Sequence, residues 1–533
     1  MPSRAYRQRR AVSRASFSLI AAVFFVLSTS LAAGVAHQLH TISTVQPIVT
    51  PKYLVLFVLD GAVPSYLHLA PLPHVDALRS TGVEYDRAFA GILESETPTG
   101  HATISTGSTP ARDGLLGFNW ITSDNNPVRL FDPNVVRQGA IEHLMEQAGA
   151  PTIAALFKSR YPKAKVVAVS GHKFYAADPL GGPAADYILY YAPDVKNRYV
   201  PTAIPGHVPP ASVLQGPGLI SQTTTLAPGE EDDRTTDLAI HAFQEVRQQV
   251  TLINLPEFDW PLGHVYGADT ARTVQLMQDF DRDLGRLEDA YRKAGVLNST
   301  LFVITSDHGM TPLQYIVPDR VLDDSVTQAG TTSLETTYST GGYIWLQNPA
   351  VSQTVAGNIV ARKDPHVQSV YYKVTSKSGD SYVRAGGLTI SPQVDTANQY
   401  LLSSFLGGNA PDVVAFCSEH TAFEKKDAET WKGNHGGGAW YSQHVVLLIS
   451  GPGVRSGAVS HAPARLEDIA PTALSLFHVK ATSMQGSVLA DALLAPSAQQ
   501  VSAQNAINRQ LNPVVDALSR QSSAELAGQA RER

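Results

Sequence analysis

Short apolar runs that end in a polar turn recur along the chain. They cover residues 53–59, 165–169, 250–255, 300–305 and 445–449, and each leads into Asp, Ser or Pro. Strands that are apolar throughout are typical of a sheet covered by helices on both faces. The pattern therefore predicts a largely parallel central sheet.

A long amphipathic helix is predicted between Ala271 and Ala294. Gly295 follows at the position of a C-terminal cap, and the next strand begins at Thr300. Apolar side chains recur there at steps of three and four residues: Val274, Met277, Phe280, Leu284, Leu287 and Tyr291. A helix that leads directly into a strand indicates an α/β fold, in which helices flank the central sheet.

Two internal regions and the C-terminal tail depart from this pattern. Residues 180–235 are rich in Pro, Gly and Thr, and residues 311–430 carry short mixed strand signals with several Gly pairs. We interpret both as insertions into a main domain at 50–480, forming a cap region over its site. The tail at 496–533 is rich in Gln, Ser and Ala, and we expect it to be poorly ordered or a loosely docked helix.

The N-terminal segment 1–36 has the composition of a targeting sequence. Several arginines between Arg4 and Arg14 precede an uncharged stretch at 15–36 that ends in small residues. This order is typical of an export signal. The stretch is also nearly long enough to span a bilayer, so an N-terminal membrane anchor is the alternative. Both interpretations place the body of the protein outside the cytoplasm, as a secreted, periplasmic or cell-surface protein.

The size, net charge and cysteine content of the chain limit which kinds of protein it can be. The chain has 533 residues, 43% of them hydrophobic, which is enough to bury a large core. Its net charge of -6, without a cluster of Lys and Arg in the mature region, excludes a nucleic-acid duplex as partner. Cys417 is the single cysteine, so a large core or bound metals must stabilise an exported chain. Cys417 itself is expected to be a buried small apolar residue.

Polar residues at the ends of the predicted strands form a candidate metal centre. In open α/β sheets, ligands bind beyond the carboxyl ends of the strands. Three carboxylates and three imidazoles fall there or in adjacent glycine-flanked loops: Asp60, Asp259, His264, Asp307, His308 and His435. Such a set suits two divalent ions, and the number of nitrogen ligands favours zinc. Each residue alone is more often part of an ordinary turn, so the prediction depends on the whole set.

A hydroxyl-rich stretch supplies a candidate nucleophile. The sequence ETPTGHAT at 96–103 follows an apolar run and opens a predicted helix. A threonine presented at a helix N-terminus beside a metal ion can act as a nucleophile. Thr97 and Thr99 are the two candidates that the residues themselves leave open.

Five motifs occur along the chain in this order: VLDG at 58–61, ETPTGHAT with TG at 96–107, DWPLGH at 259–264, TSDHG at 305–309 and GNHG at 433–436. Together they resemble the alkaline phosphatase superfamily, in its branch of type I phosphodiesterases and nucleotide pyrophosphatases. The resemblance covers roughly residues 50–480, and DIAPT at 468–472 also resembles that branch.

The resemblance implies a nucleophile and two metal sites. Members place the nucleophile four residues before the histidine that matches His101, which selects Thr97 over Thr99 and makes His101 structural. The implied ligands of one metal are Asp60, Thr97, Asp307 and His308, and those of the other are Asp259, His264 and His435. Members carry zinc at both positions. In-line attack by Thr97 on phosphorus would give a covalent phosphothreonine, which a second step hydrolyses.

The chain departs from the family pattern at two of these motifs. Asp259 and His264 are five residues apart where many members have four, which keeps Glu257 as an alternative ligand. Gly100 stands where many members have an asparagine that donates to the phosphoryl oxygens. We therefore expect backbone amides near Thr99 and Gly100 to bind those oxygens.

A third departure bears on the substrate. Monoesterases that resemble this family carry Lys-x-Arg after the strand at 165–169, whereas this chain has Lys173 without the arginine, preceded by His172. A phosphate monoester dianion benefits more from extra positive charge than a diester monoanion. We therefore expect a diester or phosphonate substrate, with Lys173 and His172 as its contacts, a solvated turn being the alternative for both.

The sequence thus predicts an exported two-metal phosphoric-ester hydrolase, a phosphodiesterase or nucleotide pyrophosphatase. Its substrate would be a small phosphoester such as a nucleotide or a phospholipid head group. A phosphomonoesterase or phosphonate hydrolase on the same site is the alternative. A metal-stabilised surface protein that binds a partner without turnover is disfavoured, because a structural zinc site needs no open position. A sulfatase is disfavoured because no Cys- or Ser-x-Pro-x-Arg sequence occurs at the nucleophile position.

Overall fold

The structure, a computed structural model, describes residues 49–532 apart from 133–134, 136–138, 268–269, 378, 408 and 424–429. The predicted export signal or anchor at 1–36 lies outside these residues. Among the helices described, none combines the length and the apolar character needed to cross a membrane.

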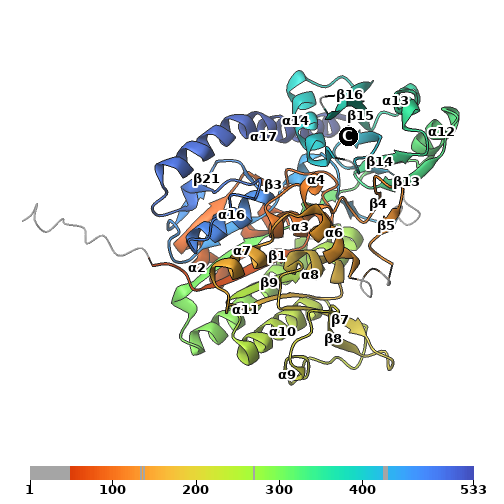
Figure 1. Ribbon diagram of the computed structural model, residues 1–533. Helices are drawn as coiled ribbons and strands as arrows, with labels where there is room; N and C mark the ends of the chain where they lie inside the picture. The colour runs from red at the N-terminus through yellow and green to blue at the C-terminus, as the bar shows by residue number, and fades with distance from the viewer. Residues whose placement is uncertain are drawn as a thin grey trace, which may run out of the picture. The chain divides into compact units, whose positions relative to one another are not determined.

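A nine-stranded sheet lies at the centre of the main fold (Figure 1). Its strands in spatial order are β21 (Ala458–Ser460), β2 (Gly82–Tyr85), β20 (Leu447–Ser450), β10 (Thr300–Thr305), β1 (Tyr53–Leu59), β9 (Val250–Leu255), β6 (Val166–Ser170), β7 (Tyr187–Pro193) and β8 (Tyr199–Ala203). The strands pair in parallel, except that β20 and β8 run against their neighbours. The predicted largely parallel sheet is confirmed.

Helices cover both faces of this sheet because its strands are apolar on both sides. Successive side chains of β1 from Leu54 to Leu59 alternate between two buried cores. The first core is closed by α3 (Thr97–Thr106), α7 (Ile153–Arg160), α8 (Phe174–Gly181) and α16 (Leu466–Leu476). The second core is closed by α2 (Pro73–Thr81), α10 (Glu230–Val246) and α11 (Thr270–Lys293). The predicted α/β class with flanking helices is therefore confirmed.

The predicted amphipathic helix is α11, which buries Met277, Phe280 and Leu284 against the sheet. Gly295 follows it with a φ of +74°, and its N–H donates to the Arg292 carbonyl. Glycine adopts this left-handed conformation without steric cost, so Gly295 ends the helix as predicted.

Residues 180–235 belong to the main sheet rather than to a cap. They supply the edge strands β7 and β8, the short α9 (Ala211–Leu214) and the first turn of α10. Leu189 and Tyr191 of β7 are buried in the second core. The Pro- and Gly-rich composition of this region reflects the loops between these elements.

The predicted insertion at 311–430 contains a second, antiparallel sheet of five strands. In spatial order these are β13 (Ser333–Tyr338), β14 (Gly341–Leu346), β17 (Val413–Cys417), β15 (Val367–Ser376) and β16 (Gly379–Gly387). One face packs on α12 (Arg320–Gln328) and α13 (Ser352–Ala361), and α14 (Pro392–Leu402) packs on the other. Cys417 is buried in the core under α12 and α13, as expected for a small apolar residue.

Short strand pairs and helices lie outside the two sheets. The pairs are β3 (Ala88–Phe89) with β22 (Ala464–Arg465), β4 (Asn119–Ile121) with β5 (Pro127–Arg129), β11 (Thr311–Pro312) with β19 (Gly433–Asn434), and β12 (Tyr315–Val317) with β18 (Thr421–Phe423). The helices are α4 (Pro110–Asp113), α6 (Ala140–Ala148) and α15 (Trp440–Gln443). Pairing of β11 with β19 holds the residue after β19, His435, near the residues that follow β10.

The C-terminal tail forms one long helix, α17 (Ala498–Glu532), and its middle is firmly packed. Leu511, Val514, Val515 and Leu518 are buried in the core that also contains one face of the second sheet. The expectation of a poorly ordered or loosely docked tail is wrong for this stretch. These four residues follow the i, i+3, i+4, i+7 spacing of an apolar helix face, which the average composition of the tail conceals.

Candidate active site

The predicted ligands meet at one edge of the main sheet. Asp60, Asp259 and Asp307 follow β1, β9 and β10, which are parallel and adjacent, so their carboxyl ends share this edge. β20 runs antiparallel, and the loop that leads into it carries His435 to the same edge. The strand order therefore brings together residues that are far apart in the sequence.

The first cluster consists of Asp60, Asp307 and His308, whose candidate ligand atoms all lie within 4.8 Å of one another. His308 Nε2 is 3.5 Å from Asp60 Oδ1 and 3.3 Å from Asp307 Oδ2. The Gly61 N–H donates to Asp307 Oδ1, and His308 Nδ1 donates to the Gly309 carbonyl. Asp307 Oδ2 and His308 Nε2 are buried without a hydrogen-bond partner among the described residues. Such orphaned ligand atoms fit a divalent cation.

The second cluster consists of Asp259, His264 and His435. Asp259 Oδ1 lies 3.1 Å from His264 Nε2 and 3.4 Å from His435 Nε2, and it is buried without a hydrogen bond in the part of the chain described. Both Nδ1 atoms donate to backbone carbonyls, His264 to Gly433 and His435 to Ser95. Because a carbonyl only accepts, each ring carries its hydrogen on Nδ1 and presents the lone pair of Nε2 to the cluster, which suits a second cation.

A wide turn explains the unusual spacing of Asp259 and His264. Residues Asp259–Tyr266 form a π-helical turn, kinked at Trp260. The i to i+5 repeat of a π-helix accommodates one residue more than an α-helical turn, so both side chains reach the second cluster.

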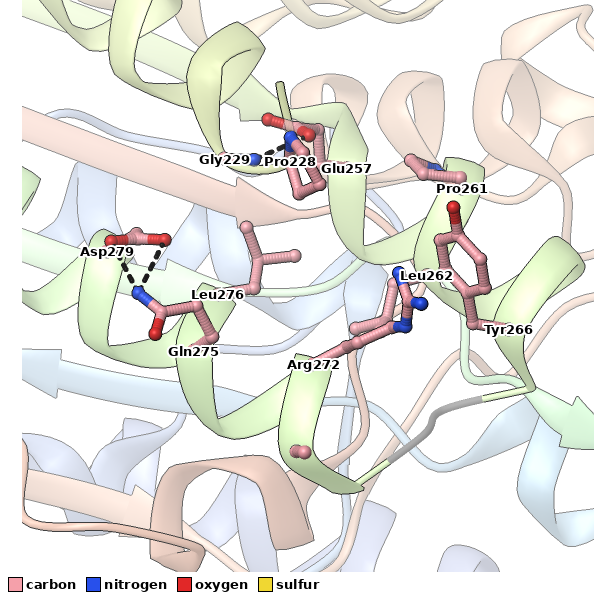
Figure 2. Close-up of a pocket in the computed structure, with 11 residues that line it drawn as sticks. Pro228, Gly229, Glu257, Pro261, Leu262, Tyr266, Arg272, Gln275, Leu276 and Asp279 are labelled. Carbon is pink, nitrogen blue, oxygen red and sulfur yellow. Dashed lines mark hydrogen bonds between the residues drawn. The ribbon is translucent and has the colours of Figure 1, made fainter. Parts of the chain in front are cut away.

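Glu257, the alternative ligand, turns away from the cluster. Its carboxylate accepts the backbone N–H groups of Gly229, Glu231 and Asp232 at the start of α10. Glu257 instead lines a separate cavity of about 530 Å³. Figure 2 shows it there with Pro261, Tyr266 and Arg272, which also line this cavity. Among the described residues that line this cavity, none belongs to either cluster.

Thr97 stands at the first turn of α3, next to the first cluster. Glu96 precedes it in an extended conformation, and the whole helix is buried. Thr97 Oγ1 lies 3.4 Å from Asp60 Oδ1, whereas the Thr99 hydroxyl is buried with no hydrogen-bond partner among the described residues and does not line the site cavity. The geometry favours Thr97 as the candidate nucleophile.

Gly100 has a packing role that differs from the predicted one. Its N–H donates to the Glu96 carbonyl within α3, at 2.8 Å, so this amide is not directed at a substrate. A Cβ at Gly100 would lie 2.4 Å from the Asp307 carbonyl oxygen. The absence of a side chain therefore lets α3 approach the Asp307 turn closely enough to present Thr97.

Lys173 is buried between the two clusters rather than in a solvated turn. Its ammonium lies 3.0 Å from Asp60 Oδ2 and 2.6 Å from Asp259 Oδ2, and its side chain is 2% exposed. His172, next to it, lines the site cavity with its ring 39% exposed.

Asn254 and His101 contact carboxylates of the first cluster. Asn254 of β9 donates to Asp60 Oδ2 and to Ser170 Oγ, and accepts a hydrogen bond from His101 Nε2. His101 Nδ1 donates to the Thr97 carbonyl and lies 3.3 Å from Asp307 Oδ2. His101 is absent from both clusters, in agreement with a structural role. Asn254 was not predicted, although an amide in an otherwise apolar strand was its signal in the sequence.

Burial and neighbouring charges set the ionisation of the site. Burial, together with Asp307, raises the pKa of Asp60 to about 7 against the opposing charge of Lys173. Burial also favours a higher pKa for Asp259, but Lys173 and His264 together hold that pKa well below its usual range. Burial lowers the pKa of His308 and of His435, which favours the neutral imidazoles that bind metals.

The site opens into a cavity of about 220 Å³ with aromatic walls. Phe118 and Phe131 stack at 4.3 Å between ring centroids, and Tyr175 packs edge-on against both. Trp260 and Trp431 contribute further rings near His264. The remaining lining residues are Glu96, Thr97, His172, Lys173, Asp259, His264, Tyr338, Asn434 and His435. Most of the aromatic lining was missed because it comes from segments without a motif.

The fold is that of alkaline phosphatases and nucleotide pyrophosphatases of known structure. Wild-type alkaline phosphatase PafA superposes with a TM-score of 0.63 at 15% identity, over 84% of this chain and 100% of that one. Murine ectonucleotide pyrophosphatase/phosphodiesterase 5, an inactive threonine-to-alanine variant in complex with AMP, gives a TM-score of 0.56 at 17% identity, over 82% of this chain and 97% of that one.

The chain belongs to the type I phosphodiesterase/nucleotide pyrophosphatase family, whose sequence model matches residues 54–438. The alkaline phosphatase PhoK of a Sphingomonas species is 26% identical to it over 285 residues, or 44% of this chain. The match spans 50% of that relative's length.

Proposed function

We propose that the protein is a metal-dependent phosphoester hydrolase with Thr97 as its nucleophile. The observation that carries the proposal is the position of the Thr97 hydroxyl, 3.4 Å from an Asp60 oxygen, beside two clusters whose inward ligand atoms lack hydrogen bonds. An inactive variant of the murine neighbour carries alanine in place of a threonine, which supports a threonine as the reacting group.

Each of the two clusters would hold one metal ion. Asp60, Asp307, His308 and Thr97 would hold one ion, and Asp259, His264 and His435 the other, with zinc favoured by the nitrogen ligands. Divalent ions bound there would lower the pKa of the Thr97 hydroxyl and offset negative charge that develops on the ester oxygens. The two inward-facing Nε2 atoms of His264 and His435 are already oriented for this by their Nδ1 hydrogen bonds.

The chain's own residues account for the two proposed chemical steps. With its hydroxyl proton released to solvent, the Thr97 oxygen attacks phosphorus as an alkoxide in line with the ester bond, which breaks and leaves a phosphothreonine on the helix N-terminus. Water then attacks the same phosphorus from the side that the leaving group vacated, and the Thr97 oxygen departs. The close approach at Gly100 holds α3 in place throughout.

The cavity favours a diester with a flat organic group. Among the described residues that line it, the cationic or titratable nitrogens belong to Lys173 and to histidines, and none belongs to arginine. This charge suits a diester monoanion better than a monoester dianion. Phe131 and Trp260 are 52% and 42% exposed, so their rings are accessible to a planar group such as a nucleobase. The AMP bound to the murine neighbour is consistent with a nucleotide.

A phosphomonoesterase is the second candidate, because the curated relative PhoK is an alkaline phosphatase. The deciding measurement is kcat/KM of the full-length, zinc-loaded protein for bis(4-nitrophenyl) phosphate and for 4-nitrophenyl phosphate. We expect the diester to be preferred, and preference for the monoester would replace the diester proposal with the second candidate. Thr97→Ala should lower turnover at least about a thousand-fold, whereas a non-catalytic binding protein would show no turnover to lose.

We also propose that the protein is extracytoplasmic, on the sequence of 1–36 alone. Fractionation of expressing cells tests this: the protein should appear in the secreted, periplasmic or membrane-anchored fraction, and a purely cytoplasmic location would contradict it.

A further inference from the structure

A carboxylate holds His172 at the rim of the site cavity. Glu231 Oε1 accepts the backbone N–H of His172 at 2.6 Å and the ring Nδ1 at 2.8 Å. The Tyr199 hydroxyl donates to the same oxygen at 2.6 Å. His172 Nε2 makes no hydrogen bond with any residue that the structure describes, and the ring lines the cavity. One nitrogen of the ring is therefore fixed and the other is left to the substrate.

Several elements of the fold maintain this contact. Glu231 lies in the first turn of α10, where its side chain is 13% exposed and its own N–H is bound by Glu257. A Cβ at Gly171 would lie 2.2 Å from Glu231 Oε1, so glycine is needed for the carboxylate to approach the loop. Burial favours a higher pKa for Glu231, but its contacts with His172 and Tyr199 bring the pKa below its usual value. An ionised Glu231 only accepts, so Nδ1 of His172 must carry a hydrogen.

Along the edge of the sheet, His172 lies beyond the strand that leads into the second cluster. Along the edge of the sheet the order is β10, β1, β9 and β6. The first cluster and Thr97 lie at β10 and β1, the second cluster begins at β9, and His172 follows β6. An oxygen displaced in line from phosphorus leaves opposite the Thr97 oxygen, which is toward β9 and β6.

We propose that His172 is a catalytic acid and base for the leaving group, positioned by Glu231. This inference rests on the proposed function. As the Thr97 oxygen bonds to phosphorus and the ester bond breaks, the Nε2 proton passes to the departing oxygen, and an alcohol leaves beside a neutral imidazole. In the second step the neutral Nε2 takes a proton from the attacking water, the resulting hydroxide bonds to phosphorus, and the Thr97 oxygen leaves as the alkoxide with which the cycle began. The imidazolium is then restored for the next cycle.

Charged and titratable groups face His172 from several elements. Glu231 faces Nδ1 from α10, with Tyr199 on its far side, and Lys173 follows on the same loop. The other titratable groups that line the cavity are Glu96, Tyr175, Asp259, His264, Tyr338 and His435. The Lys173 charge is already paired with Asp60 and Asp259, which leaves Glu231 as the partner of a charged His172.

The test is the dependence of kcat/KM on the leaving group. Full-length, zinc-loaded wild type and His172→Asn are compared on methyl aryl phosphodiesters whose phenols range from acidic to weakly acidic. A protonated leaving group matters most when it is a poor one, so His172→Asn should lose about a hundred-fold on the poorest and less than about threefold on 4-nitrophenol. His241→Asn, a histidine on α10 that donates to the Ser212 carbonyl outside the cavity, is the matched control and should match wild type.

Glu231→Gln separates positioning from packing. It keeps an acceptor for Nδ1 but removes the charge, and it should show the same leaving-group pattern with a smaller loss. The double variant should lose no more than His172→Asn, since both changes act through one proton. Equal losses on every leaving group, or no loss, would overturn the proposal. Failure of the proposed function itself looks different, because wild type would then form no phosphothreonine at Thr97 with any of these esters.

Discussion

At the scale of single residues, Lys173 supplies a buried positive charge between the two clusters. Its ammonium contacts a carboxylate of each cluster, Asp60 and Asp259, at 3.0 and 2.6 Å. In the metal-free protein it is the nearest fixed positive charge for both. Lys173→Met should therefore lower the free energy of unfolding of the metal-free protein by about 3 kcal/mol, the usual cost of removing one partner of a buried ion pair.

Bound ions would take over part of that charge, so the loss from Lys173→Met should be smaller in zinc-loaded protein. Chemical unfolding with and without EDTA measures both values. Lys165→Met is the control, because Lys165 donates to the Tyr187 hydroxyl at 3.2 Å, away from the clusters. An equal loss in the two metal states would contradict the position given to Lys173.

Gly100 gives a second prediction at this scale. A methyl group there would meet the Asp307 carbonyl at 2.4 Å and displace α3. Gly100→Ala should destabilise the protein by about 1–3 kcal/mol and reduce activity, because overpacking moves Thr97 away from Asp60. Gly357→Ala in α13 has no atom within 4 Å and should instead stabilise by about 0.5–1 kcal/mol. Thermal unfolding and kcat/KM of both variants decide this, and a neutral Gly100→Ala would refute the packing role.

Single site residues could be predicted from the sequence only where they belong to a recognisable motif. The six candidate ligands fall in strand-end motifs, and the structure gathers them into two clusters of three. Asn254 and Phe118 have no such context. Asn254 matters because β1, β6 and β9 are adjacent and bring it to Asp60 and Ser170, and that adjacency is a property of the folded sheet.

At the scale of elements, α10 and α11 pack with acidic side chains at their contact. Asp283 of α11 is buried, with Oδ1 2.9 Å from Arg286 and Oδ2 without a hydrogen bond among the residues described. Burial raises the pKa of Asp283 to about 8, with Arg286 opposing and Asp233 of α10 adding to the shift. The folded chain therefore binds this proton more tightly than the unfolded chain.

Because the pKa of Asp283 is raised in the folded chain, the stability of the protein depends on pH. The contribution of Asp283 to stability falls as pH rises from about 4, its unfolded pKa, to about 8. Asp283→Asn should lose less stability than wild type between pH 5 and pH 9 in urea unfolding. Asp289→Asn changes an exposed acid on the same helix, paired with Arg292, and should follow wild type. Parallel pH profiles for Asp283→Asn and wild type would contradict the shifted pKa.

The turn at Asp259–Tyr266 shows the limit of spacing arguments for elements. The sequence showed one residue more than the family pattern, and this left Glu257 as an alternative. A π-helical turn absorbs the extra residue, and Glu257 caps α10 instead. Periodicity predicted α11 well because an apolar stripe repeats over many turns, whereas a single turn offers no repeat.

At the scale of the whole chain, hydrophobic patterning predicted the main sheet and its helices but not where the remaining segments dock. Three of the five predicted strands have the bounds of β1, β9 and β10, and the other two, 165–169 and 445–449, overlap β6 and β20. The second sheet and α17 were described from composition, which averages over the spacing that matters. α17 contacts α14 and α15, and Arg87 between β2 and β3 bonds to Asn512 of α17. The tail thereby joins the second sheet to the main one.

Truncation of Leu511 tests whether α17 joins the second sheet to the main sheet. It is 1% exposed in the core shared by α17, α14 and the second sheet. Leu511→Ala should lower the free energy of unfolding by about 3 kcal/mol, through lost burial and the cavity that remains. Because α17 contacts both parts of the fold, the loss should appear as one cooperative transition shifted to lower temperature, measured by calorimetry.

The matched control is Val501→Ala, since Val501 lies on the same helix with 40% exposure and its truncation should change stability by less than about 0.5 kcal/mol. If Leu511→Ala leaves stability unchanged, α17 does not contribute to the core, and the original expectation of a loose tail was correct. If it splits the unfolding into two transitions, the second sheet unfolds independently, and the helix does not couple the two sheets. A single shifted transition is the result expected of a helix that is packed in the core of the second sheet and bonded to the main one.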